Sequence, residues 1–98
     1  MTISVTKKES YTVVNVEGRL DATTAPILEK TLNQDIGDTN NLVLDLKNLD
    51  YISSAGLRVI LSAQKKMQKI GSMKLINVKE NVMEIFEITG FADILTIE

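Results

Sequence analysis

The chain has 98 residues, of which 44% are hydrophobic and 24% charged, a composition typical of one small globular domain. Its formal net charge of -2 argues against nucleic acid as a partner. There is no cysteine and no histidine, which excludes disulfides, thiolate metal sites and the commonest general base. We therefore expect an aliphatic core and no cofactor or metal.

Two further classes are excluded by the distribution of apolar residues. No run approaches the roughly 20 apolar residues that span a bilayer. The first ten residues, MTISVTKKES, lack the apolar stretch of a signal peptide. We expect a cytoplasmic protein without direct membrane insertion, with one domain over residues 1–98.

The chain opens with two stretches in which apolar and polar side chains alternate. Residues 3–7 (ISVTK) and 12–17 (TVVNVE) both follow a two-residue period, which is the period of a β-strand. They predict a β-hairpin joined at residues 8–10. Gly18 is expected to end the second strand.

A first helix is predicted over residues 25–35. Thr23 or Thr24 offers a hydroxyl for its N-cap, and Pro26 suits a first helical turn. A polar turn over residues 37–41 is expected to follow.

A strand and a longer helix are predicted in the middle of the chain. Residues 41–49 (NLVLDLKNL) alternate leucines with other side chains, which indicates a strand. Residues 55–70 repeat apolar side chains every three or four positions, which indicates an amphipathic helix, and Gly71 is expected to end it in a left-handed conformation. The remaining predicted elements are a fourth strand at 73–78, a third helix at 81–88 and a last edge strand at 94–97.

The alternation of strands and helices predicts right-handed βα crossovers. If the strand order follows the chain, that handedness places every helix on one side of the sheet. Polar side chains on one face of the second and third strands agree with a face open to water: Asn15, Glu17, Asp45 and Lys47. The predicted fold class is α/β, a mixed sheet of four to five strands with helices on one face, built as a β-hairpin followed by βα repeats.

Motifs for catalysis are absent. The sequence contains neither a G-x-x-x-x-G-K-[ST] loop nor a G-x-G-x-x-G fingerprint, so nucleotide binding has little support. The carboxylates that could form an acid and base pair stand at strand ends and turns, where solvated or capping roles are usual: Glu17, Asp21, Asp45 and Asp50. We expect no catalytic residues and no enzyme.

Two adjacent serines stand where the third strand gives way to the second helix. Either Ser53 or Ser54 fits the helix N-cap, a role that stabilises a helix by about 1 kcal/mol. The small residues that follow, Ala55 and Gly56, leave room for one hydroxyl to face solvent while the other caps. A phosphate there would lie at the positive end of the helix dipole, so the fold would tolerate it.

Four segments in the same order resemble one family. YISSAGLRVIL (51–61) resembles the signature of the STAS, or anti-sigma-factor antagonist, family. GRLDATTAP (18–26), LVLDLKNLDYI (42–52) and TGFADILTI (89–97) resemble its first turn, its central strand and its C-terminal end. The resemblance covers nearly the whole chain.

The resemblance implies a protein that binds an anti-sigma factor with serine kinase activity and releases the sigma factor. It implies that Ser54 is the phosphorylation site that ends this binding, and that a phosphatase reverses it. The implied partner-binding residues are Asp21, Thr23, Ser53, Ser54, Ala55, Gly56 and Leu57. Ser53 stands where the antagonists best described in the family often have Asp. We expect a monomer or a weak dimer.

Two alternatives remain open. The domain can act without phosphorylation, as a subunit or scaffold of another complex such as a lipid-transport assembly. It can also be a small nucleotide-binding protein. A basic cluster, Lys65, Lys66 and Lys69 with Lys74, fits either a solvated helix face or an acidic partner or anionic lipid.

Overall fold

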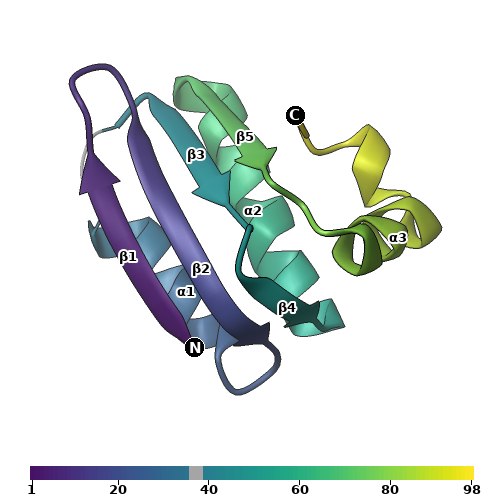
Figure 1. Ribbon diagram of the computed structural model, residues 1–98. Helices are drawn as coiled ribbons and strands as arrows, with labels where there is room; N and C mark the ends of the chain where they lie inside the picture. Colours follow the sequence, from purple (N-terminus) through teal and green to yellow (C-terminus); the bar gives the residue numbers. More distant parts are fainter. Residues whose placement is uncertain (36–38) are drawn as a thin grey trace.

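The computed structural model describes residues 1–35 and 39–98. A five-stranded mixed sheet carries α1 and α2 on one face, and α3 packs against β4 (Figure 1). The expected fold class is confirmed. The elements in chain order are β1 (Thr2–Lys7), β2 (Thr12–Leu20), α1 (Ala25–Lys30), the π-helical turn η1 (Thr31–Asp35), β3 (Asn41–Asp45), β4 (Leu49–Ile52), α2 (Ser54–Ile70), β5 (Ser72–Ile76), α3 (Glu80–Thr89) and the 3-10 turn η2 (Phe91–Asp93).

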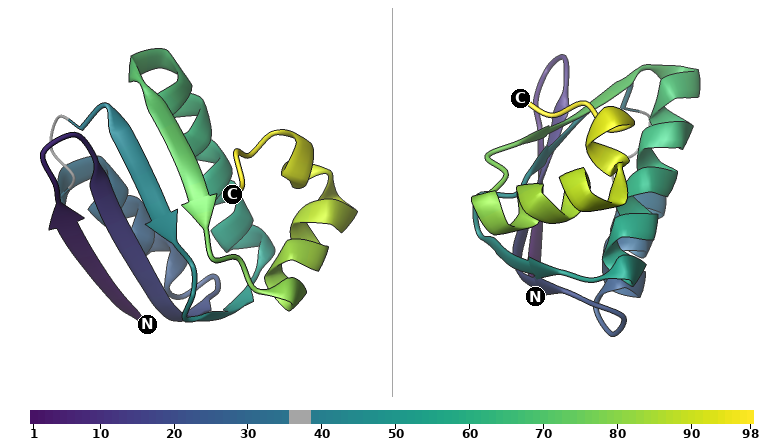
Figure 2. Two further views of the ribbon diagram at one scale, coloured as in Figure 1. Left: turned by 45° about the horizontal axis from the view of Figure 1, so that its top comes forward. Right: turned by 90° about the vertical axis from the view of Figure 1, so that its right-hand side faces the viewer.

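The sheet combines one antiparallel pair with three parallel pairs. β1 and β2 form the expected antiparallel hairpin. β2 then runs parallel to β3 and, further along its length, to β4, while β5 pairs with the other side of β3. The path β1-β2-β3-β5 follows the chain, as expected. Figure 2 shows, in its right-hand view, the sheet as one layer and α1 with α2 as the second.

The core lies between these two layers. Val14, Leu44 and Leu75 are paired in register on three neighbouring strands and are fully buried. From α2, Ile60 and Met67 pack against this face. The other face is partly open to water, as the polar pattern predicts, because Asn15, Asp45 and Ile76 on it are only half-buried.

The prediction of one strand over residues 41–49 is wrong, because the chain turns at residues 46–48. The Asp45 carboxylate accepts a hydrogen bond from the Lys47 backbone N–H at 3.0 Å, and this local bond competes with strand pairing. The prediction that Gly18 ends its strand is also wrong. Gly18 adopts a φ of +100° at a register shift, and β2 continues past it to pair with β4.

The start of α1 and the end of α2 differ in detail from expectation. No hydroxyl of Thr23 or Thr24 caps α1: Thr24 occupies the N-cap position without a side-chain cap bond. Helical structure reaches Asp35 as predicted, with η1 as its last turn. Gly71 is not left-handed, since its φ of 172° is extended. Glycine is needed there because a Cβ would lie 1.7 Å from the Asn40 carbonyl oxygen.

The C-terminal region is helical where predicted but does not form a last strand. α3 ends at Gly90, which is left-handed with a φ of 81°. The strand expected at 94–97 is reduced to one bridge, between Leu75 and Ile97. The polar turn expected at 37–41 begins outside the described residues. In the described part of the chain, no helix combines the length and apolarity needed to cross a membrane.

Candidate functional site

The predicted site residues come from two turns at one edge of the sheet. β2 and β4 are parallel neighbours, with Leu20 opposite Ile52 at their ends. The Ser53 backbone N–H donates to the Leu20 carbonyl at 2.8 Å, which ties the two turns together. The turn that begins at Asp21 therefore lies beside the start of α2, at the lower end of Figure 1.

The structure assigns different environments to the two serines. Ser53 is the N-cap of α2: its Oγ accepts a hydrogen bond from the Gly56 backbone N–H at 3.4 Å. Ser54 is the first residue of the 17-residue helix and is exposed. Its hydroxyl makes no hydrogen bond to any protein group within residues 1–35 and 39–98. The capping role belongs to Ser53, and the Ser54 hydroxyl is open to solvent.

The residues after the serines hold the start of α2 against the sheet. A Cβ on Gly56 would lie 2.6 Å from Leu20 Cγ, so glycine permits the close approach of α2 to β2. Gly56 and Leu57, two of the predicted partner-binding residues, are buried and lie beneath the surface. Ala55 is half-buried beside Ser54.

Asp21 organises the turn that leads into α1. Its Oδ1 accepts hydrogen bonds from the backbone N–H groups of Thr23 at 3.0 Å and Thr24 at 3.1 Å. The bond from the Thr24 backbone is the largest cause that lowers the pKa of the Asp21 carboxyl, with further help from Thr23 and from the charge of Arg19. These bonds hold the turn ahead of α1, whose N-cap residue Thr24 makes no side-chain cap bond. Thr23 itself is exposed.

Sequence reasoning missed Arg19 and Tyr51. The Arg19 guanidinium lies 4.2 Å from the centre of the Tyr51 ring, a cation–π contact across the β2–β4 pair. Both side chains are exposed, and Arg19 also lies 4.0 Å from Asp21. The signal for this pair is its cross-strand register, which requires knowing that β4 pairs with β2.

We call the surface formed by Asp21, Thr23, Ser53, Ser54 and Ala55 the docking corner.

Comparison with known proteins agrees with this architecture. The sequence model of the STAS domain family matches residues 2–98. The chain belongs to the STAS domain family. Its STAS relatives include the anti-sigma-B factor antagonist of Bacillus subtilis, which is 34% identical over 97% of this chain and 88% of the relative. The anti-sigma-B factor antagonist of Staphylococcus aureus is 30% identical over 97% of this chain and 90% of the relative.

A solved STAS structure has the same fold over almost the whole chain. The crystal structure of an anti-sigma factor antagonist from Mycobacterium paratuberculosis superimposes with a TM-score of 0.89, at 25% identity, over 98% of this chain and 83% of that one. The fold of this chain is thus that of a solved STAS domain over almost its whole length.

Proposed function

We propose that this STAS domain is an anti-sigma-factor antagonist controlled by phosphorylation of Ser54. It binds a kinase-type anti-sigma factor through the docking corner, and the sigma factor is released. The proposal rests chiefly on one observation: Ser54 presents an exposed hydroxyl, without a hydrogen bond to the described part of the chain, at the first position of α2, while Ser53 supplies the cap. Relatives that are 30% and 34% identical and carry the name anti-sigma-B factor antagonist support it.

The phosphoryl transfer needs no catalytic group from this chain. The Ser54 oxygen attacks the γ-phosphorus of ATP bound to the partner kinase, an O–P bond forms, and the bond between the γ-phosphorus and the bridging oxygen breaks to release ADP. A base of the kinase accepts the hydroxyl proton. In this proposal the domain is a substrate and a binding module, with residues 1–98 acting as one unit in the cytoplasm. A phosphatase restores the free hydroxyl.

The added phosphate is compatible with the fold and incompatible with the bound partner. It carries about -1.5 to -2 charges and would lie at the N-terminus of α2, where the helix dipole favours negative charge. Ser54 contributes nothing to the core, and Ser53 keeps its bond to Gly56. The partner surface that packs on the small, uncharged side chains of Ser53, Ser54 and Ala55 would instead face a bulky dianion.

The test is capture of partners from a lysate of the source cells, with and without ATP, followed by identification of the captured proteins. We expect an anti-sigma factor with a kinase domain, bound without ATP and released with it. Ser54→Ala should stay bound when ATP is added. Ser62→Ala is the matched control, because it removes an exposed hydroxyl of the same helix outside the docking corner and should keep the ATP response. If Ser54→Ala is released as readily as the parent chain, the proposal fails.

A partner that stays bound to the parent chain in the presence of ATP would point to the alternative of a constitutive STAS subunit. Peptide mass spectrometry of the ATP-treated chain separates these cases. The switch predicts one phosphate, on Ser54, and the constitutive role predicts none.

A further inference from the structure

The exposed side of α2 carries only positive charge. Between Ser54 and Ile70 there are four basic residues and no acidic one, and all four are exposed: Arg58, Lys65, Lys66 and Lys69. The whole chain nevertheless has a net charge of -2, so the charges are segregated between different surfaces. A helix face with one sign of charge favours a partner surface of the opposite sign.

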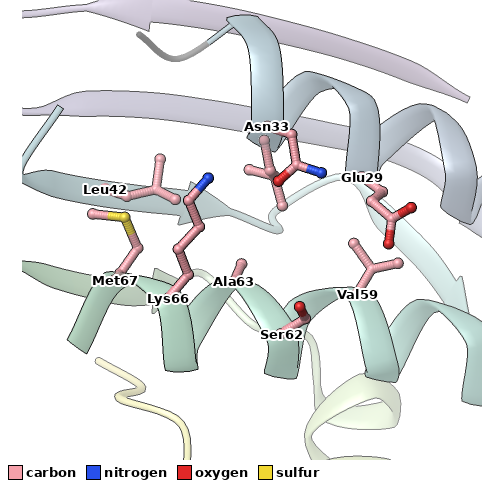
Figure 3. A pocket seen from close by; sticks show the side chains of 9 residues that line it. Glu29, Asn33, Leu42, Val59, Ser62, Ala63, Lys66 and Met67 are labelled. Atoms are coloured by element: carbon pink, nitrogen blue, oxygen red, sulfur yellow. The ribbon is translucent and has the colours of Figure 1, made fainter. Parts of the chain in front are cut away.

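A small groove lies beside this basic face, between α1 and α2. Figure 3 shows Lys66 reaching across it from α2 toward Asn33, which follows α1, with Glu29 further along the same wall. The apolar lining includes Leu42 and Met67. The cavity volume is about 40 Å³. The smallest cavity that admits one water has a volume of about 10–15 Å³. We call the space between α1 and α2 the α1–α2 groove; it has room for the tip of one branched apolar side chain.

The surface of α3 carries the opposite charge to that of α2. Between Glu80 and Thr89 there are three acidic residues and no basic one. Glu80, Glu84 and Ile88 are spaced four residues apart, so they form one ridge along the helix. Ile88 is 84% exposed, the highest value among the exposed large hydrophobic side chains of the described residues. We call these three residues the α3 ridge.

We propose that the α3 ridge of one copy docks on the α1–α2 groove of a second copy. Ile88 enters the groove, and Glu84 lies beside Lys66. A second copy is the partner because this chain itself carries both an apolar-floored groove beside the basic side of α2 and an acidic ridge with an exposed isoleucine. Glu29 also lines the groove, on the α1 wall, so the positive charge that faces the ridge comes from α2.

The two surfaces are different, so the contact is heterologous and joins copies head to tail. One side chain in a small groove and a few exposed ion pairs give a weak contact that salt disrupts. Lys66 stands twelve residues beyond Ser54, about 18 Å along α2 at the usual helical rise. The groove side of the contact therefore lies away from Ser54, and the self-association does not depend on the proposed function.

The experiment is sedimentation velocity over a concentration series up to millimolar, at low and high salt. We expect an average mass that rises above the 10.9 kDa of one chain with concentration and falls back at high salt. Lys66→Glu and Glu84→Lys should each lower the association constant about tenfold, because each places like charges in contact. Ile88→Ala should weaken association as well. All three positions are exposed, so the variants are expected to fold.

An equimolar mixture of Lys66→Glu and Glu84→Lys should restore association, because every contact between the two variants again joins opposite charges. Lys47→Glu and Glu17→Lys are the matched controls: both positions are exposed and lie outside the groove and the ridge. They should associate like the parent chain. A parent chain that stays monomeric throughout, charge variants that associate as it does, or a mixture that stays monomeric would each overturn the proposal.

Discussion

Two adjacent serines with the same side chain have different physical roles at the start of α2. Ser53 is extended, with a φ of -100° and a ψ of 176°, and this conformation directs its Oγ toward the Gly56 N–H. Ser54 is already helical and its hydroxyl faces solvent. The sequence places a serine at the cap but leaves open which one, because the answer depends on the backbone angles at the junction.

Replacement of each serine by alanine should separate these roles. We expect Ser53→Ala to lower the free energy of unfolding by about 1 kcal/mol, since the N-cap bond is lost. Ser54→Ala should change it by less than about 0.5 kcal/mol, because an exposed hydroxyl without a partner is removed. Urea denaturation of the two variants beside the parent measures both values. Equal losses would contradict the assignment of the cap to Ser53.

The Asp21 carboxylate should make stability depend on pH. Hydrogen bonds from the Thr24 and Thr23 backbone lower the pKa of this carboxyl in the folded protein below its ordinary value of 3.8. A group whose folded pKa is lowered stabilises the fold above the ordinary value, and this contribution is lost as the pH falls through the folded pKa. The parent chain should therefore be more stable than Asp21→Asn at neutral pH.

The difference between the parent and Asp21→Asn should shrink as the pH falls below 3.8, because the parent carboxylate then takes up a proton. Chemical denaturation at a series of pH values measures it. Asp93→Asn is the matched control, because it removes an exposed carboxylate far from this turn in the sequence. A pH-independent difference for Asp21→Asn would contradict the proposed role of its charge.

At the scale of elements, the junction between β2 and α2 depends on close packing at Gly56. A Cβ there would lie 2.6 Å from Leu20 Cγ and 2.9 Å from Leu20 Cδ2, and Leu20 is fully buried and cannot move aside freely. We expect Gly56→Ala to destabilise the domain by about 1–3 kcal/mol through overpacking. Thermal and urea unfolding would report the loss.

A double-mutant cycle identifies the cause of that loss. In a Leu20→Ala background the two closest opposing atoms are gone and only Ile52 Cγ1 remains, at 3.0 Å, so the additional cost of Gly56→Ala should fall. An unchanged cost in both backgrounds would show that contact with Leu20 is not its cause.

Elements with a strong local pattern could be predicted from the sequence. The β1–β2 hairpin, α2 and α3 each follow a clear period. The break between β3 and β4 was missed, because the alternation of Leu42, Leu44 and Leu46 extends to the edge of the turn and another leucine, Leu49, follows it. The turn arises from the Asp45 side chain, whose choice of a backbone partner is a local detail that periodicity does not report.

The candidate site was predictable in its residues and less so in its geometry. The sequence signature places Ser53 and Ser54 at a helix start, but the Arg19–Tyr51 contact depends on the parallel pairing of β2 with β4. That pairing requires β2 to extend through Gly18, where a glycine normally suggests a strand end. Long-range register of this kind is set by the assembled sheet.

At the scale of the whole molecule, Ser54 lies apart from the packing that stabilises the domain. The apolar core lies between the sheet and the helices α1 and α2, while Ser54 stands outside it at the rim of the sheet. In the proposed switch, a change of charge at Ser54 therefore acts on the surface and not on the core. The core keeps its packing, and the domain remains folded in both states of the proposed switch.

The most direct measurement compares the unphosphorylated and Ser54-phosphorylated chains in two assays, thermal unfolding and affinity for the anti-sigma partner. The account predicts that the midpoint of unfolding moves by no more than the 4–8 °C or so that corresponds to 1 kcal/mol in a domain of this size. It predicts that affinity falls about a hundredfold or more, as expected when a charge is forced into an unmatched interface. Retained binding by the phosphorylated chain, or loss of its folded structure, would contradict it.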